Sequence, residues 1–454
     1  MYDYIVYGGG PTGMTLAYLL SKNNFKILLI EKENKLGGCW KVEWQHNKYF
    51  TEHSPRVLLK DSSSSLFKLF NQINFNWKEE TVSTYGNIFE TNYKILSFFL
   101  ENMSLIDLIK IIGLFLGNYQ NNQTVLEWSV ENKITTKGIK ALEIFSIALA
   151  NSPNKLLVSE LVESGNFPIM FLQFKDNEKW INLLEQKLIK NNVTIWKNAK
   201  LLKLYKKNNV IESSDILKDG LIKKVYGKKH LLTLPPLAFQ ELINNNKILQ
   251  NNWLDYNLFN KWVENSYYIS FGFQFHFKEK QNQDVFNKWC DTCKNKYNII
   301  ILPTSNYTNK YSYDNKIKEV WSGTIVDTKD INHLTKNQII KIITSLLKVN
   351  PDIVTLYDGT IKKNGKWYSK DSAFSLGKSG VILSKGTLDN LETIGPHNEK
   401  GITTINKAVK IAVEWIDKNN LETFKLKEKK INYVILILVI LFIVYLIYPQ
   451  YRFK

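Results

Sequence analysis

The first 31 residues carry two strand patterns separated by one helical pattern. Residues 4–7 form a short run of β-branched and aromatic side chains, and residues 26–30 form a second hydrophobic run. Between them, apolar side chains recur at helical spacing from Met14 to Leu20. The order strand, helix, strand predicts the start of an α/β domain with a parallel sheet.

The turn between the first strand and the helix is built from glycine. Gly8, Gly10 and Gly13 follow the spacing G-x-G-x-x-G, with Pro11 and Thr12 between the last two. In this pattern the first glycine permits a tight turn, the second lets the backbone approach a pyrophosphate, and the third lets the helix pack closely on the strand. The anion then lies on the free N–H groups at the helix start. The pattern therefore predicts a dinucleotide site made by these five residues.

An acidic residue and a second pair of glycines follow the second strand. The acid lies at a distance from the first glycines that suits a carboxylate bonding the ribose hydroxyls of an adenosine. The glycine pair would place bare backbone beside the extended dinucleotide. The residues expected to line the cofactor here are Glu31, Lys32, Gly37, Gly38, Cys39 and Trp40.

These motifs resemble those of the flavin amine oxidase and phytoene desaturase superfamily, whose members carry the double glycine after the ribose-binding acid and use FAD. The family pattern usually has an arginine where this chain has Cys39. The resemblance implies an α/β fold: a Rossmann-like FAD-binding domain of the GR2 type with an inserted α+β substrate domain.

Later segments extend the resemblance. Residues 193–204 look like the family's internal strand pair at the adenine end, which makes Leu201 a cofactor contact. Residues 390–408 resemble the strand and helix start that close the FAD domain, and by that likeness Gly395, Thr404 and Ile405 face the flavin. A helix N-terminus there would stabilise the negative charge of reduced flavin.

The resemblance divides the body into two discontinuous domains. The expected FAD-binding domain comprises residues 1–65, 187–245 and 385–424. The expected substrate domain comprises residues 66–186, which are mainly helical in pattern, and residues 246–384. Within the latter, the segments that alternate as strands do are 267–277, 297–302 and 319–326.

Residues 103–116 predict a strongly apolar helix. Asp107, Lys110 and Gly113 recur at a spacing of three and leave a wide apolar face. Burial in the core is the favoured interpretation of this face. The alternative is that the helix flanks an apolar substrate channel that opens towards a membrane.

A long apolar run lies near the end of the sequence. Residues 431–448 would span about 27 Å as a helix, enough for a bilayer as thin as that of the endoplasmic reticulum. Four lysines lie in the basic linker 425–430, whereas only Arg452 and Lys454 follow the run, so the positive-inside rule places the body in the cytosol. The run predicts a single-pass, tail-anchoring transmembrane helix; a buried core helix is the alternative.

Composition narrows the class of partner. The chain is 44% hydrophobic over 454 residues, which suffices for two folded domains. The net charge of +18 favours anionic partners. However, no basic run with interleaved aromatic residues accompanies that charge, so we expect no nucleic-acid partner. The first strand pattern begins at Tyr4 and leaves no room for a signal peptide.

Three cysteines, Cys39, Cys290 and Cys293, cannot make a disulfide framework, which fits a reducing cytosol. Cys290 and Cys293 have the spacing of a redox pair but lack the expected strand before and helix after. Fortuitous spacing is favoured over a dithiol that exchanges electrons with flavin. No histidine cluster completes a zinc site, and no metal site is expected.

Two short segments carry the candidate catalytic residues. His53 and Arg56 follow the double glycine, where superfamily chains pass beneath the isoalloxazine ring. Arg56, the only arginine of the body, could hold the flavin, its pyrophosphate or a substrate oxygen, while His53 could relay a proton. The alternative for Arg56 is a structural ion pair. Trp367 and Tyr368 resemble the family's aromatic wall on the substrate side, with core packing as the alternative.

The resulting hypothesis is an FAD-dependent oxidoreductase that transfers hydride from an apolar or amine-containing small molecule to flavin N5. No second glycine fingerprint for a nicotinamide cofactor is visible, so the expected electron acceptor is oxygen or a quinone-like molecule. A flavin-dependent sugar-nucleotide mutase is one alternative, but it needs arginines for its substrate's pyrophosphate. A prenyl-lipid escort protein is the other, but its glycine turn is degraded, whereas the turn is intact here.

Overall fold

The computed structural model describes residues 1–60, 64–84, 97–120, 122–149, 151–164, 171–266, 270–281, 297–369, 374, 376–401 and 403–424. Its helices are α1 (Pro11–Lys22), α2 (Ser65–Gln72), α3 (Trp77–Glu80), α5 (Leu105–Phe115), α6 (Val125–Glu131), α7 (Thr136–Ala148), α8 (Val158–Ser164), α9 (Lys179–Lys190), α10 (Pro236–Asn245), α11 (Tyr256–Asn265), α13 (Lys336–Leu347) and α14 (Ile405–Lys418).

The strands are β1 (Tyr2–Tyr7), β2 (Ile27–Ile30), β3 (Glu43–Gln45), β4 (Tyr49–Thr51), β5 (Leu58–Leu59), β6 (Thr81–Ser83), β7 (Phe171–Phe174), β8 (Thr194–Trp196), β9 (Ala199–Lys207), β10 (Val210–Lys218), β11 (Leu221–Val225), β12 (Gly227–Leu232), β13 (Ser270–Phe277), β14 (Ile299–Leu302), β15 (Glu319–Val326), β16 (Ile353–Leu356), β17 (Thr360–Lys363), β18 (Lys366–Ser369) and β19 (Leu391–Thr393).

A parallel sheet in the order β19-β12-β1-β2-β8 carries the first glycine turn. In its centre, Tyr4 pairs with Ile27 on one side and with Lys229 on the other. Alternate side chains of β1 enter different cores: Val6 packs with α1, α9 and α14, whereas Ile5 packs with the side of β9 and α10. Because both faces are covered, β2 is a continuous hydrophobic run. The predicted α/β class with a parallel sheet is confirmed.

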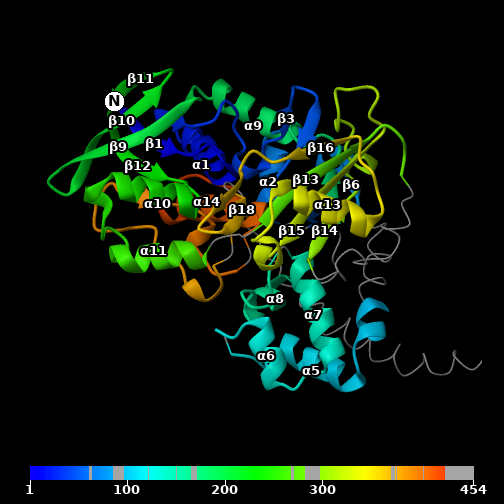
Figure 1. The fold of residues 1–454 in the computed structure, drawn as a ribbon. Coiled ribbons are helices and arrows are strands. Elements are labelled where there is room, and N and C mark those ends of the chain that lie inside the picture. Colours follow the sequence, from blue (N-terminus) through cyan, green and yellow to red (C-terminus); the bar gives the residue numbers. More distant parts are fainter. Residues whose placement is uncertain are drawn as a thin grey trace, which may run out of the picture.

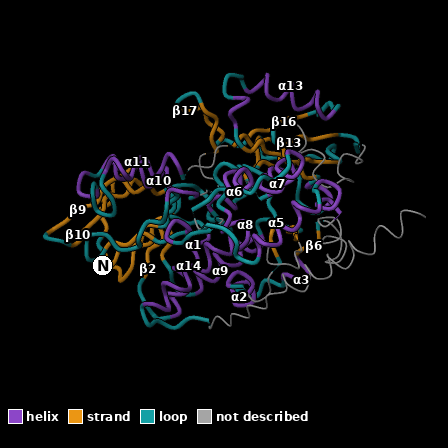
Figure 2. The backbone as a smooth tube through the Cα atoms, turned by 90° about the horizontal axis from the view of Figure 1, so that it is seen from below, coloured by secondary structure: helices purple, strands orange, loops and turns teal. Residues whose placement is uncertain are grey.

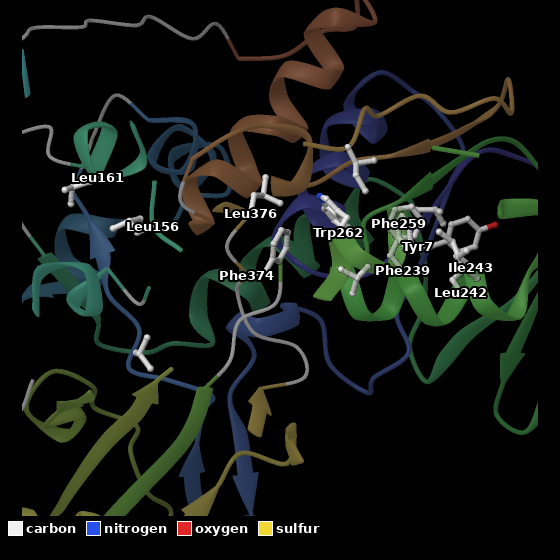
Figure 3. Packing of buried hydrophobic residues seen from close by; sticks show 14 of the residues in the cluster. Tyr7, Leu156, Leu161, Phe239, Leu242, Ile243, Phe259, Trp262, Phe374 and Leu376 are labelled. Atoms are coloured by element: carbon white, nitrogen blue, oxygen red, sulfur yellow. The ribbon is translucent and has the colours of Figure 1, made fainter. Parts of the chain in front are cut away.

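The two covering layers are visible in the tube view. Helices α1, α9 and α14 lie together beside the sheet, while α10 and α11 lie near β9 and β10 (Figure 2). The second core continues from Tyr7 through Phe239, Phe259 and Trp262 towards Leu376 (Figure 3). One hydrophobic cluster therefore extends from the parallel sheet through α10 and α11 to Leu376.

A second, antiparallel sheet has the order β14-β15-β13-β16. Strands β13 and β15 are buried along their whole length, and α13 contributes to their core. β14 and β15 lie within the predicted strands 297–302 and 319–326, and β13 covers the described part of 267–277. This region therefore combines an antiparallel sheet with a helix, as expected of an α+β arrangement.

Helices α5 to α8 form a lobe at one end of the molecule (Figure 1). The region 66–186 is mainly helical as predicted, but it also contains β6 and β7, which pair with each other. These strands are three and four residues long, so their period is too short to register in the sequence.

The orientation of α5 differs from the favoured interpretation of its sequence. Asp107 is fully buried, whereas Ile106 and Ile109 are 64% and 54% exposed. The core interpretation is therefore wrong for this face of the helix. The physical reason is that Asp107 accepts hydrogen bonds from the backbone and side chain of Thr135, so that the one acidic residue of α5 points inwards.

Two expected features lie outside the described residues: the apolar run 431–448 and the pair Cys290 and Cys293. Among the helices that the structure describes, none is both long enough and apolar enough to cross a membrane.

Four buried histidines make stability depend on pH. Burial lowers the pKa of His53 and His397 to about 3 and that of His230 and His276 to about 4. In the unfolded chain a histidine titrates near pH 6.5. Below that pH the unfolded state therefore binds more protons than the folded state, in which these four imidazoles stay neutral. Acid therefore favours unfolding through these four side chains.

We predict that the urea midpoint of unfolding falls as the pH drops from 6.5 to 5. Each buried histidine contributes up to about 1.4 kcal/mol per pH unit in that window. Replacing His276 by Gln should flatten the dependence, whereas replacing exposed His333 by Gln should leave it unchanged. A midpoint that stays constant over this range would show that the four imidazoles are not kept neutral by the fold.

Candidate functional site

Two helix starts meet at the carboxyl edge of the parallel sheet. β1 leads through the glycine turn into α1, and β19 leads through a loop into α14. The hydroxyl of Thr12 donates to the carbonyl of Ala408 at 3.1 Å, which fixes the first turn of α1 against α14. Helix N-termini present unbonded N–H groups and a positive dipole end, so this edge is suited to an anionic ligand.

Packing within the chain explains two of the three glycines in the first turn. Gly8 has a φ of +111°, and a Cβ there would lie 2.8 Å from the carbonyl oxygen of Thr233. A Cβ on Gly13 would lie 1.9 Å from the carbonyl oxygen of Gly8. Neither position accepts a side chain in this fold.

Gly10 is different. Its φ of −74° and ψ of −179° are open to any residue, and it forms the N-cap of α1. A Cβ at this position would meet a single atom within 4 Å, the Cα of Gly38 at 3.9 Å. The chain itself therefore gives no reason for a glycine here. The space that a side chain would fill lies in front of the first turn of α1, where a phosphate group would bind.

The second glycine pair closes this space from the other side. The N–H of Gly37 donates to the carbonyl of Gly9 at 2.8 Å, and Gly37 has a φ of +112°. A Cβ on Gly38 would approach the Cα of Gly10 to 3.0 Å. The two glycine segments thus touch through bare backbone, as expected if both line one extended ligand.

Glu31 ends β2 against the glycine turn. Its carboxylate is buried and accepts hydrogen bonds from the N–H groups of Gly9, at 2.6 Å, and Glu33, at 3.0 Å. Burial raises the pKa of Glu31, and the two N–H donors oppose that shift. The predicted contact with a ribose stays a prediction, while an additional role in holding Gly9 is evident. Lys32 lies beside it, 3.6 Å from the carboxylate of Glu33.

Arg56 clamps the turn that follows the second glycine pair. Its guanidinium donates to the carbonyls of Trp40, at 2.7 Å, and Lys41, at 2.6 Å. Its Nε lies 3.1 Å from Oε2 of Glu52, and both side chains are almost fully buried. Arg56 is thus part of a structural ion pair, which the sequence analysis gave as the alternative to a contact with flavin or substrate. It holds Cys39 and Trp40 in position through the backbone.

His53 lies between this turn and the second sheet. Its Nδ1 is 2.7 Å from the hydroxyl of Ser54, and its side chain also bonds the backbone of Cys39. A Cβ on Gly272 of β13 would lie 2.2 Å from the carbonyl oxygen of His53, so the two segments are in direct contact. With a pKa of about 3, lowered by burial and then by Arg56, the imidazole is neutral. Its proposed proton relay stays a prediction.

The remaining candidates differ in burial. Trp367 is buried in the core of the antiparallel sheet, where the centre of its ring lies 5.4 Å from that of Phe271. This position agrees with core packing, the alternative to a place in the substrate wall. Tyr368 is half-buried on the same short strand. Leu201 lies partly buried on β9, next to the end of β2.

The closing segment adopts the predicted helix start. Thr404 is the N-cap of α14, and its hydroxyl accepts from the N–H of Lys407 at 3.1 Å. Ile405 is the first residue of the helix. The N–H of Gly395 is bonded to the side chain of Asn398 at 2.8 Å.

Lys407 holds the loop before α14, a role that the sequence analysis did not predict. Its buried Nζ donates to the carbonyls of Glu399, Lys400 and Gly401 at 2.7, 2.8 and 2.8 Å. Burial lowers its pKa to about 8, against the opposing effect of nearby carboxylates. Its spacing in the sequence indicates that it faces the core, because Lys407 lies four and eight residues before Ile411 and Trp415, which are both buried.

The role of Thr233 was also not predicted from the sequence. Its hydroxyl donates to the carbonyls of Tyr7 and Gly8, each at 2.9 Å, and so pins the end of β1. Among the residues that the structure describes, no group of three or more histidine, cysteine, aspartate or glutamate side chains is placed to hold a metal ion.

Comparison with known proteins agrees with this geometry. Residues 6–73 match the family model of an NAD(P)-binding Rossmann-like domain. Similar solved structures include a putrescine oxidase bound to putrescine (12% identity, TM-score 0.56, covering 92% of this chain and 99% of that chain) and a cyclohexylamine oxidase from Brevibacterium oxydans (10% identity, TM-score 0.57, covering 90% and 97%).

This chain has the fold of the flavin amine oxidases. An oxidoreductase from Methanosarcina mazei shares it at 13% identity and a TM-score of 0.60, over 91% of this chain and 99% of that one. The resemblance seen in the sequence is thus confirmed at the level of the fold.

Sequence similarity points to a second group. A UDP-galactopyranose mutase of Mycoplasma genitalium is 23% identical over 255 residues, which are 50% of this chain and 62% of that protein. A UDP-galactopyranose mutase of Mycoplasma pneumoniae is 33% identical over 63 residues, 13% of this chain and 16% of that protein. The matched part of this chain spans less than two thirds of either relative.

The buried Arg56–Glu52 pair generates a stability prediction. Replacing Arg56 by Met leaves the Glu52 carboxylate buried without its partner, which should cost about 3–5 kcal/mol of unfolding free energy. Changing Glu52 to Gln as well should recover part of that loss. The surface pair of Lys140 and Glu143 is the control, and replacing Lys140 by Met should cost less than about 1 kcal/mol. Equal urea midpoints for the two single variants would contradict the clamp.

Proposed function

We propose that the chain is an FAD-dependent oxidoreductase that acts on an apolar or amine-containing small molecule. The observation that carries the cofactor assignment is Gly10, whose missing side chain leaves room in front of α1 for which the chain has no use of its own. A dinucleotide pyrophosphate fits that room and the helix start behind it. The flavin amine oxidase fold favours FAD over a nicotinamide dinucleotide.

The closing segment suits the other end of the cofactor. The N-terminus of α14 lies beside that of α1, and the ammonium group of Lys407 holds the preceding loop by donating to its carbonyls. Bound FAD would supply the redox chemistry by accepting hydride at N5 from the substrate. The protein's part is to hold the ring, exclude water and place the substrate.

Two considerations bear on the substrate. The names of the structural neighbours, putrescine oxidase and cyclohexylamine oxidase, favour an amine. The apolar run 431–448 favours a lipophilic molecule, because we propose that this run anchors the body to a membrane with its catalytic part in the cytosol. We expect oxygen or a quinone-like molecule to reoxidise the flavin.

A flavin-dependent sugar-nucleotide mutase is the second candidate, favoured by the similarity to UDP-galactopyranose mutases. The same cofactor site would serve it. Arg56 argues against it: the only arginine within residues 1–424 is almost fully buried, where it is paired with Glu52 and bonded to two backbone carbonyls, so it is not free to reach a substrate diphosphate. An escort protein for prenylated partners would not need the intact glycine turn.

We predict that replacing Gly10 by Val lowers FAD content at least tenfold while the cofactor-free protein still folds. The added Cβ would lie 3.9 Å from its nearest neighbour, the Cα of Gly38, and the side chain would occupy the phosphate position. Gly113→Ala is the control, since a Cβ on this glycine of α5 would meet only the side chain of Asn118, at 3.2 Å. It should keep full FAD content.

The same preparations separate the two candidate functions. Bleaching of bound FAD by an amine or a polyene under anaerobic conditions supports the oxidoreductase. Interconversion of a UDP-sugar by protein with chemically reduced flavin, together with no bleaching by either substrate class, identifies a mutase. A Gly10→Val variant that binds FAD as well as the parent would refute the shared cofactor site.

A further inference from the structure

The outer face of α5 is apolar, and the described part of the chain leaves its side chains exposed. Leu105, Ile109 and Leu116 lie on one side of the helix at spacings of four and seven and are 41%, 54% and 59% exposed. Ile106, beside them, is 64% exposed, and Val130 of the neighbouring α6 is 62% exposed. We call the four side chains Leu105, Ile106, Ile109 and Leu116 the α5 stripe.

The fold holds the stripe outwards. Ser104 and Asp107 form a capping box at the start of α5, and Asp107 also accepts from the N–H and hydroxyl of Thr135, the N-cap of α7, at 3.0 and 2.6 Å. On the same inner side, Ile111 and Leu114 are buried. Rotating the helix to bury the stripe would break these bonds and expose a carboxylate-centred network, so the outward orientation is fixed.

The lobe that carries this face lies at one end of the molecule (Figure 1). Helices α5 and α6 lie at the end of the molecule opposite the parallel sheet (Figure 1), and the view from below shows them in front of the body (Figure 2).

The charge and the exposed area of the α5 stripe indicate which kind of surface it would contact. The ammonium group of Lys110 donates to the carbonyl of Lys133 at 3.1 Å and that of Lys137 to the carbonyl of Glu101 at 2.6 Å, so the lobe carries two positive charges near the start of α5 and the start of α7. The exposed apolar area is on the order of 300 Å², well below the roughly 800 Å² that each partner buries in a standard protein interface. Apolar side chains with lysines at their edge match the acyl and phosphate layers of a bilayer surface.

We propose that the α5 stripe docks on a phospholipid bilayer, with Lys110 and Lys137 at the level of the phosphates. This contact is separate from the cofactor site and from the apolar run 431–448. It would place the helical lobe, which reaches the loop before α14 through α8, next to the membrane. There, the Leu157 N–H is bonded to Glu160 at 3.0 Å, and that buried carboxylate also bonds the backbone of Gly401.

The test uses the full chain reconstituted into vesicles of phosphatidylcholine and phosphatidylserine. A cysteine at Ile109 (I109C) is labelled with an environment-sensitive fluorophore, and the parent protein labelled in parallel supplies the background from its own cysteines. Nitroxide groups on the lipid acyl chains then quench any label within the bilayer. Leu258→Cys on α11 is the matched control, because Leu258 is 59% exposed on another element.

The expected result is several-fold stronger quenching at position 109 than at position 258. Three results would overturn the proposal: equal quenching at the two positions, a label at 109 that remains in water, or a label at 109 that is shielded from water but not quenched by lipid. The last would mean that protein covers the stripe. FAD content, measured on the same samples, reports separately on the proposed function.

Discussion

Everything at the proposed site depends on one close approach of bare backbone, where Gly10 at the head of α1 faces Gly38 in the next turn. Gly37 bonds to Gly9, and a Cβ on Gly38 would come within 3.0 Å of the Cα of Gly10. This contact brings two segments 28 residues apart to the same helix start. The helix N–H groups and the dipole end then face a space with no side chain in it, and an anion is the ligand that such a space favours.

The surrounding residues secure this geometry without occupying it. Thr233 holds the end of β1, Glu31 holds the N–H of Gly9, and Arg56 holds the carbonyls of Trp40 and Lys41. Lys407 does the same for the loop before α14. Each is a buried or half-buried polar group whose charge or hydroxyl bonds backbone atoms, so the geometry of the site is fixed by side chains that lie outside it.

The sequence predicted the parallel sheet because its signals are local. Strand, glycine turn, helix and acid lie within the first 31 residues, and β15 and α14 have long, regular patterns. The sequence could not assign Arg56 or the face of α5, because both depend on partners far along the chain or on neighbouring elements. Glu52 and Arg56 are close in sequence, but only the fold buries them together. The inward side of α5 is set by Thr135, 28 residues beyond Asp107.

The central claim is that the space before α1 holds the diphosphate of FAD. Its most direct test is to purify the full chain, denature it, and identify any released cofactor by chromatography and mass. The account predicts FAD at one molecule per chain, present on purification or taken up when offered. A folded protein that releases no flavin and fails to bind added FAD would contradict it.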